Sequence, residues 1–129
     1  MTVSGALVVV VDDDLSVRES LPELLRQCGF AATAFASADD FLAANVENQT
    51  SCLILDVAMP GMSGIELVRH LVQHGRTFPV IFISGGGDES DRPRLLQKGA
   101  VDCLFKPFSE VDLLDAVRAA LGVNPSDIP

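Results

Sequence analysis

Short apolar segments alternate with longer stretches of helical periodicity five times along the chain. Three of these segments, with the sequences LVVVV, CLILD and VIFIS, are almost continuously apolar. Such runs are typical of parallel strands, because helices cover both faces of a parallel sheet. The predicted strands are Ala6–Val11, Ala31–Phe35, Cys52–Leu55, Val80–Ile83 and Val101–Phe105.

Apolar residues recur at helical spacing in the stretches that follow the strands. The stripe of the first helix comprises Val17, Leu21, Leu24, Leu25 and Cys28. The stripe of the last helix comprises Val111, Leu114, Val117 and Leu121. Three glycines lie where helix-terminating residues are expected, namely Gly29, Gly75 and Gly99. The predicted helices are Ser16–Cys28, Ala38–Val46, Gly64–His74, Asp91–Lys98 and Glu110–Leu121.

These repeated strand–helix units predict an α/β fold with a right-handed, doubly wound parallel sheet. In such sheets the functional residues gather beyond the carboxyl ends of the strands. The 129 residues suffice for one domain with a sizeable core. We assign residues 1–121 to this domain and residues 122–129, with the sequence GVNPSDIP, to a linker-like tail.

Two prolines fall within the predicted helices. Pro22 lies about two turns into the first helix, where an interior proline costs ~3 kcal/mol or more, so we expect a kink on a solvent-facing side. Pro93 suits the first turn of the fourth helix, with Asp91 as its N-cap. This helix is then short, and because it follows Gly85–Gly87 we expect a mobile segment between the fourth strand and the fourth helix.

Polar side chains follow four of the five strands. Asp12–Asp14 come after the first strand, Asp56 after the third, Ser84 after the fourth and Lys106 after the fifth. Because the carboxyl ends of parallel strands meet at one edge of the sheet, these side chains are expected to converge. A single loop aspartate would indicate little, whereas all of these groups together predict a site.

The chemistry of these residues favours phosphoryl acceptance. Carboxylates a few ångströms apart raise each other's pKa unless a cation joins them, and oxygen ligands favour a hard divalent ion such as Mg²⁺. With such an ion bound, a carboxylate can attack a phosphoryl group and form an acyl phosphate. Lys106 and the Ser84 hydroxyl can then hold the other phosphoryl oxygens. Such a site retains the group it accepts, so it is a switch more than an enzyme.

Charge and composition narrow the classes of partner. The net charge of −9, without a Lys/Arg cluster, disfavours direct binding of nucleic acid. No apolar run approaches the ~20 residues of a membrane span, and the first residues lack the basic region of a signal peptide. Three cysteines without CxxC spacing indicate small core residues in a reducing compartment. These features predict a cytoplasmic protein.

The motifs resemble the receiver domain of bacterial two-component response regulators. They are VVVVDDD at 8–14, LDVAMPGMSG at 55–64, VIFISGGGD at 80–88 and KGAVDCLFKPF at 98–108. The stretches DDDLSVRESL and FASADDFL further resemble the FixJ/NarL-type subfamily, whose receiver is joined to a helix-turn-helix domain. The resemblance implies a flavodoxin/CheY-like fold, with five strands in the order 2-1-3-4-5 and five helices.

The resemblance also assigns roles to individual residues. Asp56 would be the phosphoacceptor and, with Asp12, Asp13 and the backbone carbonyl of Ala58, would bind the metal. Asp13 would be a direct ligand and Asp12 would act mainly through water. The implied ion is Mg²⁺, with Mn²⁺ or Ca²⁺ as substitutes. Asp14 would instead serve the start of the first helix.

Further positions match the parts of a receiver that respond to phosphorylation. Ser84 holds the position of the switch hydroxyl. Lys106 would pair with Asp56 and then with its phosphoryl group, and the Lys106–Pro107 peptide bond would be cis. Ala58 and Gly86, at positions that modulate loss of the phosphoryl group, are both small here.

The function implied is signal reception. A histidine kinase would supply the phosphoryl group, the output surface would change, and an output domain of the helix-turn-helix type, outside this chain, would control transcription. The domain would catalyse only its own phosphorylation and slow dephosphorylation. Phosphorylation-dependent dimerisation is compatible with this function.

One position departs from the family pattern. Cys103 stands three residues before Lys106, where receivers usually carry an aromatic residue that turns inward on phosphorylation. A thiol is too small for that role. Phe105 lies on the same side of the strand by alternation, so it is the candidate substitute. We therefore expect the output face around Cys103 to respond differently to phosphorylation.

Three alternatives belong to other classes. A phosphatase of the haloacid dehalogenase type would use Asp12 as nucleophile and Asp14 as acid, and would leave Asp56 without a role. A receiver-like interaction module would no longer accept phosphate. A flavin-binding sheet lacks a Trp or Tyr to stack on the ring. His70 and His74, one helical turn apart without a third ligand nearby in sequence, indicate surface histidines.

Overall fold

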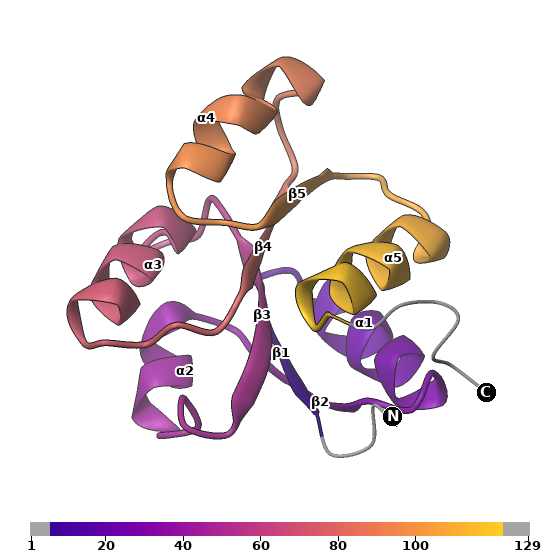
Figure 1. Cartoon of the computed structure of the whole chain (residues 1–129), viewed down its shortest axis with the longest axis horizontal. Helices are drawn as coiled ribbons and strands as arrows, with labels where there is room; N and C mark the ends of the chain where they lie inside the picture. Colours follow the sequence, from indigo (N-terminus) through magenta and orange to yellow (C-terminus); the bar gives the residue numbers. More distant parts are fainter. Residues whose placement is uncertain (1–5, 123–129) are drawn as a thin grey trace.

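The sheet at the centre of the molecule has five parallel strands, as seen in the computed structural model, which describes residues 6–122 (Figure 1). Their spatial order is β2-β1-β3-β4-β5, so the predicted doubly wound topology is confirmed. The strands are β1 (Leu7–Val11), β2 (Ala31–Phe35), β3 (Thr50–Asp56), β4 (Val80–Ser84) and β5 (Asp102–Phe105). The helices are α1 (Leu15–Gln27), α2 (Ala38–Ala43), α3 (Gly64–Gln73), α4 (Arg92–Gln97) and α5 (Glu110–Ala120), with a 3-10 turn at Glu89–Asp91 before α4.

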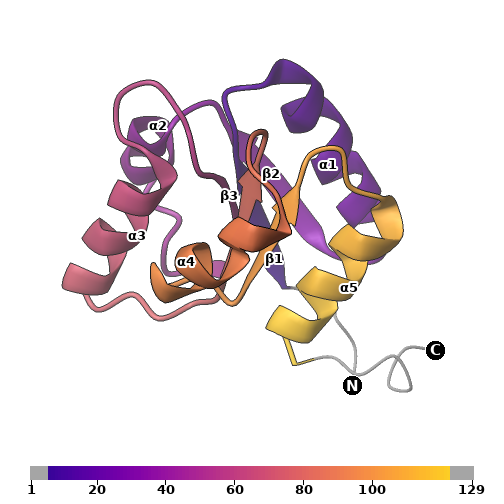
Figure 2. The same ribbon diagram turned by 90° about the horizontal axis from the view of Figure 1, so that it is seen from above.

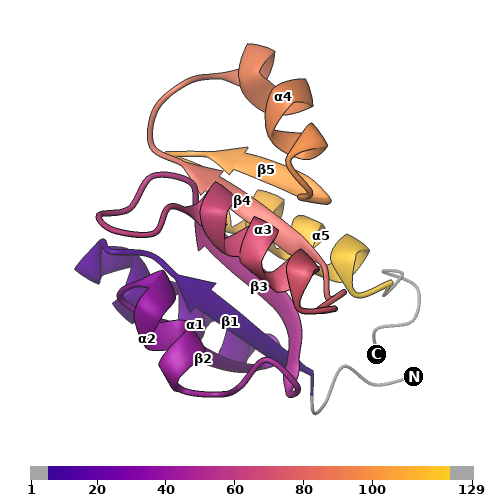
Figure 3. The ribbon, with the colours of Figure 1, turned by 90° about the vertical axis from the view of Figure 1, so that its left-hand side faces the viewer.

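Helices cover both faces of the sheet, which explains the continuously apolar strands. Helices α1 and α5 lie on one face and α2, α3 and α4 on the other, as Figures 2 and 3 show. Successive strand residues point to opposite faces. Val9 and Val11 therefore join the core under α2–α4, and Val8 and Val10 join the core under α1 and α5. All four valines are fully buried.

Local signals in the sequence fix most helix ends. The Asp14 carboxylate accepts from the Ser16 backbone N–H at 2.9 Å and caps α1, and Ser63 and Glu66 form a capping box at α3. Gly29 and Gly75 have positive φ just after α1 and α3, as expected. Helix α2 ends at Ala43, earlier than the predicted Val46, because Asn45 adopts the left-handed conformation with φ of 54°.

The start of α4 differs in part from the prediction. Pro93 lies in the first turn and the helix is only six residues long, as expected. The Asp91 side chain, however, makes no capping hydrogen bond to α4. Asp88 instead caps the preceding 3-10 turn, since its carboxylate accepts from the Ser90 N–H at 2.9 Å. The chain tightens into this turn before α4, which displaces the cap toward the N-terminus.

Two expectations about helix faces were wrong. Pro22 is buried beside Leu21 and Leu25, not solvent-facing, and α1 continues through it. Its ring lies on the apolar face of the helix, where a missing backbone donor is offset by burial of a compact apolar side chain. Val111 is 65% exposed, because the buried face of α5 is formed by Leu113, Ala116 and Val117.

Two predictions concern the ends of the chain. The linker-like tail predicted for residues 122–129 lies, apart from Gly122, outside the described residues, and so does the start of the predicted domain at residues 1–5. Within residues 6–122, none of the helices combines the length and the apolar character required to traverse a lipid bilayer.

Candidate functional site

The carboxyl ends of four strands place the predicted site residues at one edge of the sheet. Asp12 follows β1, Asp56 ends β3, Ser84 ends β4, and Lys106 follows β5. Backbone hydrogen bonds between the strands continue to this edge. The Asp12 N–H donates to the Phe35 carbonyl at 3.1 Å, and the Lys106 N–H donates to the Ser84 carbonyl at 2.8 Å. The edge is therefore a fixed platform, and its side chains start from defined positions.

Three carboxylates form a cluster on this platform. Asp12, Asp13 and Asp56 each have an oxygen within 4.8 Å of the others. Asp12 is fully buried and Asp56 is 6% exposed, whereas Asp13 is exposed. Asp14 caps α1 and lies outside the cluster, as the sequence indicated.

Burial and like charge act together on Asp56. Desolvation and the neighbouring Asp12 carboxylate raise the pKa of Asp56 to about 7. The Ala58 N–H, which donates to Asp56 Oδ1 at 3.2 Å, and the positive charge of Lys106 oppose this increase. A carboxyl group in a cleft whose pKa is raised this far above its ordinary value is a candidate functional group.

Lys106 pairs with Asp12, not with Asp56 as the resemblance implied. Its Nζ lies 3.1 Å from Asp12 Oδ2, and this is the ion pair of Lys106 in the described part of the chain. Asp12 is the more deeply buried carboxylate, so an ammonium group gains most by lying against it. Partial burial lowers the pKa of Lys106, but the contact with Asp12 outweighs this effect and the net pKa is raised.

The acid cluster fits a hard divalent cation. Asp12 Oδ2 is buried and accepts no hydrogen bond of acceptable geometry, although Lys106 Nζ lies beside it. Lys106 balances one of the negative charges, whereas three carboxylates lie within 4.8 Å of one another, so a further cation would reduce their mutual repulsion. The atoms of the cluster that could bind a metal are carboxylate oxygens, the ligand type that Mg²⁺ prefers. Ala58, whose carbonyl the resemblance adds to this set, is exposed beside Asp56.

An open cleft of about 400 Å³ adjoins Asp56. Ser84 lies at its wall and donates its hydroxyl hydrogen to the Gly86 carbonyl, within its own loop. The Lys106–Pro107 peptide bond beside the cleft is cis. The residues that line the cleft are Asp56, Val57, Ala58, Ser84, Gly85, Gly86, Gly87, Asp91, Arg94, Leu95 and Lys106.

The loop after Asp56 returns tightly to the site. A Cβ on Gly64 would lie 2.2 Å from the Asp56 carbonyl oxygen, so only glycine fits there. The Gly64 N–H donates to the Val57 carbonyl at 3.0 Å and closes the loop. The close approach explains the glycine of the LDVAMPGMSG motif and holds the backbone of Asp56 in place.

The strand that carries the switch positions has two relevant side chains. Cys103 is fully buried and Phe105 half-buried, both against the core under α2–α4, as alternation indicated. Ser84 and Phe105 are partners in the β4–β5 register, and Cys103 pairs with Phe82. Phe105 is therefore the aromatic residue that pairs in the sheet with the switch hydroxyl position. Burial raises the pKa of the Cys103 thiol to about 11, so Cys103 is an uncharged core residue.

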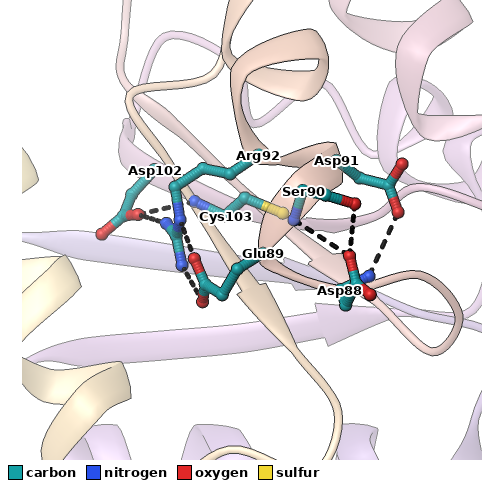
Figure 4. Close-up of polar contacts among 7 residues, drawn as sticks. All are labelled: Asp88, Glu89, Ser90, Asp91, Arg92, Asp102 and Cys103. Atoms are coloured by element: carbon teal, nitrogen blue, oxygen red, sulfur yellow. Dashed lines mark hydrogen bonds and ion pairs between the residues drawn. The ribbon is translucent and has the colours of Figure 1, made fainter.

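Arg92 is a residue that the sequence did not single out. Its guanidinium contacts Glu89 at 2.7 Å and Asp102 at 2.5 Å and lies 5.7 Å above the centre of the Phe105 ring. The Asp102 carboxylate also accepts from the Cys103 N–H at 2.7 Å, as Figure 4 shows. The only sequence signal was an arginine three residues after a glutamate, which is common on helices.

The two histidines form no metal site in the described residues. Their rings stack with centroids 4.1 Å apart, and His74 Nδ1 contacts the His70 carbonyl at 2.8 Å. The acid cluster is the metal-compatible group in residues 6–122.

A doubly wound parallel sheet with oxygen ligands, a hydroxyl and an ammonium group at its carboxyl edge defines an α/β protein of the flavodoxin/CheY type. The chain belongs to a family of this class, because the family model described as "Response regulator receiver domain" matches residues 8–118. Receiver domains of response regulators are signal transducers.

Individual relatives agree with the family. Nodulation protein W of Bradyrhizobium diazoefficiens is 46% identical over 115 residues, which are 89% of this chain and 51% of that protein. Transcriptional regulatory protein FixJ of Azorhizobium caulinodans is 44% identical over 113 residues, 88% of this chain and 54% of that protein. The solved structure of response regulator StyR has 44% identity and a TM-score of 0.83, over 95% of this chain and 62% of that one. The chain thus spans about half the length of the curated relatives it matches.

Proposed function

We propose that this domain accepts a phosphoryl group on Asp56 from a histidine kinase and then changes its output surface. The observation that carries the proposal is the convergence at one edge of a nearly buried Asp56, two further carboxylates, Ser84 and Lys106 beside an open cleft. Asp56 is the carboxylate of the cluster that lines this cleft, so it is the acid that an incoming phosphoryl group can reach.

The transfer itself is a nucleophilic displacement. A carboxylate oxygen of Asp56 attacks phosphorus, the bond from phosphorus to the histidine nitrogen breaks, and its electron pair stays on the imidazole. Lys106, which lines the same cleft as Asp56, can then exchange Asp12 for a phosphoryl oxygen, and the Ser84 hydroxyl can turn from the Gly86 carbonyl to another phosphoryl oxygen. These two movements carry the change from the site to β4 and β5.

Mg²⁺ is the cofactor that fits, and receiver domains typically use it. Asp12, Asp13, Asp56 and the Ala58 carbonyl would hold it, with Asp12 acting mainly through water, and Mn²⁺ or Ca²⁺ could substitute. When bound, the ion neutralises charge on the carboxylates and on the transferred group. Without the ion, burial and the neighbouring Asp12 carboxylate raise the pKa of Asp56 to about 7 and so disfavour its charged form.

Transmission would use Phe105 in place of the aromatic residue usual at position 103. Phe105 is the register partner of Ser84, so a movement of Ser84 toward the phosphoryl group would reach the strand position that carries the ring. Cys103 is buried in the core and too small to report that change. The output face around Cys103 is therefore expected to respond through Phe105.

Partners follow from the relatives and from the chemistry. The donor would be a sensor histidine kinase, and because FixJ is named a transcriptional regulatory protein, a helix-turn-helix output domain outside this chain would contact DNA. The net charge of −9 disfavours direct contact of this domain with DNA. Phosphorylation-dependent dimerisation is compatible with the proposal. The cytoplasm, where free thiols stay reduced, is the proposed location.

The proposal excludes an enzyme that turns over an external substrate. The acyl phosphate remains on Asp56 as the signal, and the only reactions are autophosphorylation and slow hydrolysis. A phosphatase using Asp12 would need Asp14 as its acid, but Asp14 caps α1 and lies outside the cluster.

Acetyl phosphate with Mg²⁺ provides the test. Intact mass should increase by one phosphoryl group in the wild type and in Asp14→Asn, a matched loss of a neighbouring acid, but not in Asp56→Asn. Reductive trapping followed by peptide mapping should place the group on Asp56. An unmodified wild type, with either acetyl phosphate or a kinase as donor, would indicate an interaction module that no longer accepts phosphate.

A further inference from the structure

Part of the wall of the cleft beside Asp56 is formed by α4 and the turn before it. Of the residues that line the cleft, Asp91 and Arg94 are the charged side chains that this wall contributes. Lys106, which follows β5, also lines the cleft. A phosphoryl group on Asp56 would therefore enter a cleft that two basic side chains line, Arg94 and Lys106.

The cleft has little else to cover a bound group. Ala58 has only a methyl group, and Gly86 has none, although both line the cleft. A Cβ placed on Gly86 would meet no atom within 4 Å, so the space above the loop is open. No side chain from these two positions can shield a phosphoryl group from water or hold its oxygens.

Arg94 is only loosely held in the absence of a phosphoryl group. Its guanidinium lies 3.7 Å from Asp91 Oδ1, and the side chain is 58% exposed. An exposed pair at this spacing contributes little, so the guanidinium can exchange partners at small cost. Asp91 has a second role, because its Oδ2 accepts from the Asp88 N–H at 3.1 Å.

Arg92, two residues earlier, is in the opposite situation. Its side chain is 29% exposed, and Figure 4 shows its guanidinium bound by both Glu89 and Asp102. Arg92 therefore fixes the start of α4 on β5, while Arg94 remains available on the side of the cleft. Arg92 thus attaches α4 to the sheet, and Arg94 is free to bind a group in the cleft.

We propose that Arg94 is an additional ligand of the phosphoryl group on Asp56 and that it determines how long this group persists. The inference rests on the proposed function. On phosphorylation the guanidinium leaves Asp91 and binds phosphoryl oxygens, for which its planar pair of donors is suited. It supplies the side-chain contact that Ala58 and Gly86 cannot provide, and it joins α4 to the phosphorylation site.

The reaction that Arg94 slows is hydrolysis of the acyl phosphate. The oxygen of a water molecule attacks phosphorus, the bond from phosphorus to the Asp56 oxygen breaks, and its electron pair returns to the carboxylate. The water proton passes to solvent, and inorganic phosphate leaves. A guanidinium that occupies the open side of the phosphoryl group excludes this water, whereas the negative charge of Asp91 works against retention of the group.

Loss of the phosphoryl group after removal of acetyl phosphate measures the effect, with intact mass followed over time. We expect Arg94→Ala to shorten the lifetime by about tenfold, the change that corresponds to one charge-assisted hydrogen bond. Arg94→Lys should restore part of the lifetime. Asp91→Asn, which keeps an acceptor for the Asp88 N–H, should lengthen it.

The matched control is Arg69→Ala on α3, which removes the same charge from an exposed position outside the cleft. A lifetime in Arg94→Ala equal to that of Arg69→Ala would overturn the role of Arg94. The unphosphorylated Arg94→Ala protein should keep the wild-type unfolding midpoint, and a lower midpoint with an unchanged lifetime would show a structural role only. Absence of any adduct in all variants would instead refute phosphoryl acceptance itself.

Discussion

At the scale of single residues, burial of Asp56 beside a second carboxylate opposes the charged form that a phosphoryl acceptor requires. The same contacts make the site responsive to a cation, because a nearby positive charge returns the carboxylate to its ionised form. At neutral pH the buried negative charge of Asp56 therefore lowers the free energy of unfolding. This effect can be measured as a pH dependence of stability.

Without metal, the free energy of unfolding should fall between pH 4 and pH 7 through Asp56. Its pKa rises from 3.8 in the unfolded chain to about 7 in the fold, so the folded state binds the extra proton in this window. The favourable contribution is complete below the lower value and is lost as pH rises through the upper one. We expect Asp56→Asn to exceed the wild type by on the order of 1–2 kcal/mol at pH 8 and to match it near pH 4.

Urea unfolding in the presence of a chelator, at several pH values, measures this difference. The comparison isolates Asp56, because all other titrating groups are common to both proteins. Equal differences between the two proteins at pH 4 and pH 8 would contradict the raised pKa.

At the scale of elements, the segment between β4 and α4 contains three exposed glycines and is attached to β5 through the contacts of Arg92. Gly85, Gly86 and Gly87 are exposed, and Gly87 has a φ of 81°. The 3-10 turn and α4 follow, and Arg92 attaches them to β5 through Asp102 and the Phe105 ring. The expected mobility of this segment stays a prediction. We expect the contacts of Arg92 to restrict that mobility.

Arg92→Ala should loosen α4 while leaving the sheet intact. The substitution removes two ion pairs and a cation–π contact from a partly buried position, which together contribute about 1–2 kcal/mol. Hydrogen exchange should show lower protection over residues 88–97 and unchanged protection in β1 and β3. The exposed Arg26 in α1 provides a control, and an Arg26→Ala protein with the same change in α4 would argue against a local anchor.

At the scale of the whole molecule, the sheet brings three carboxylates that repel one another to a single edge of an acidic protein. The net charge is −9, and three carboxylates share a space of a few ångströms beside one lysine. A divalent ion at this point should stabilise the entire fold, because it binds the folded chain and not the dispersed carboxylates.

Mg²⁺ at pH 8 should therefore increase the free energy of unfolding by about 1–3 kcal/mol when it is present at roughly ten to a hundred times its Kd. The increase should vanish in Asp13→Asn and persist in Asp14→Asn, which retains a good N-cap. Sodium chloride at equal ionic strength controls for general screening of the charge. A gain that survives loss of Asp13 would place the ion elsewhere.

The extent of prediction from sequence differs between fold and site. Strand alternation, apolar runs and local caps depend on neighbouring residues, so the sheet, most helix ends and the role of Asp14 could be predicted. Pro22 and Val111 were assigned to the wrong environments, because the face that a helix presents depends on its rotation against the sheet. Asp91 failed as a cap because the turn before α4 tightened.

The sequence by itself determined which groups stand at the strand ends, since the order of strands and polar residues places Asp12, Asp56, Ser84 and Lys106 on one edge. Only the tertiary structure decided how these groups pair. Lys106 lies against Asp12 and not Asp56, because the more deeply buried carboxylate gains most from the ammonium. The different contacts that Arg92 and Arg94 of α4 make likewise depend on how that short helix packs, which no local pattern encodes.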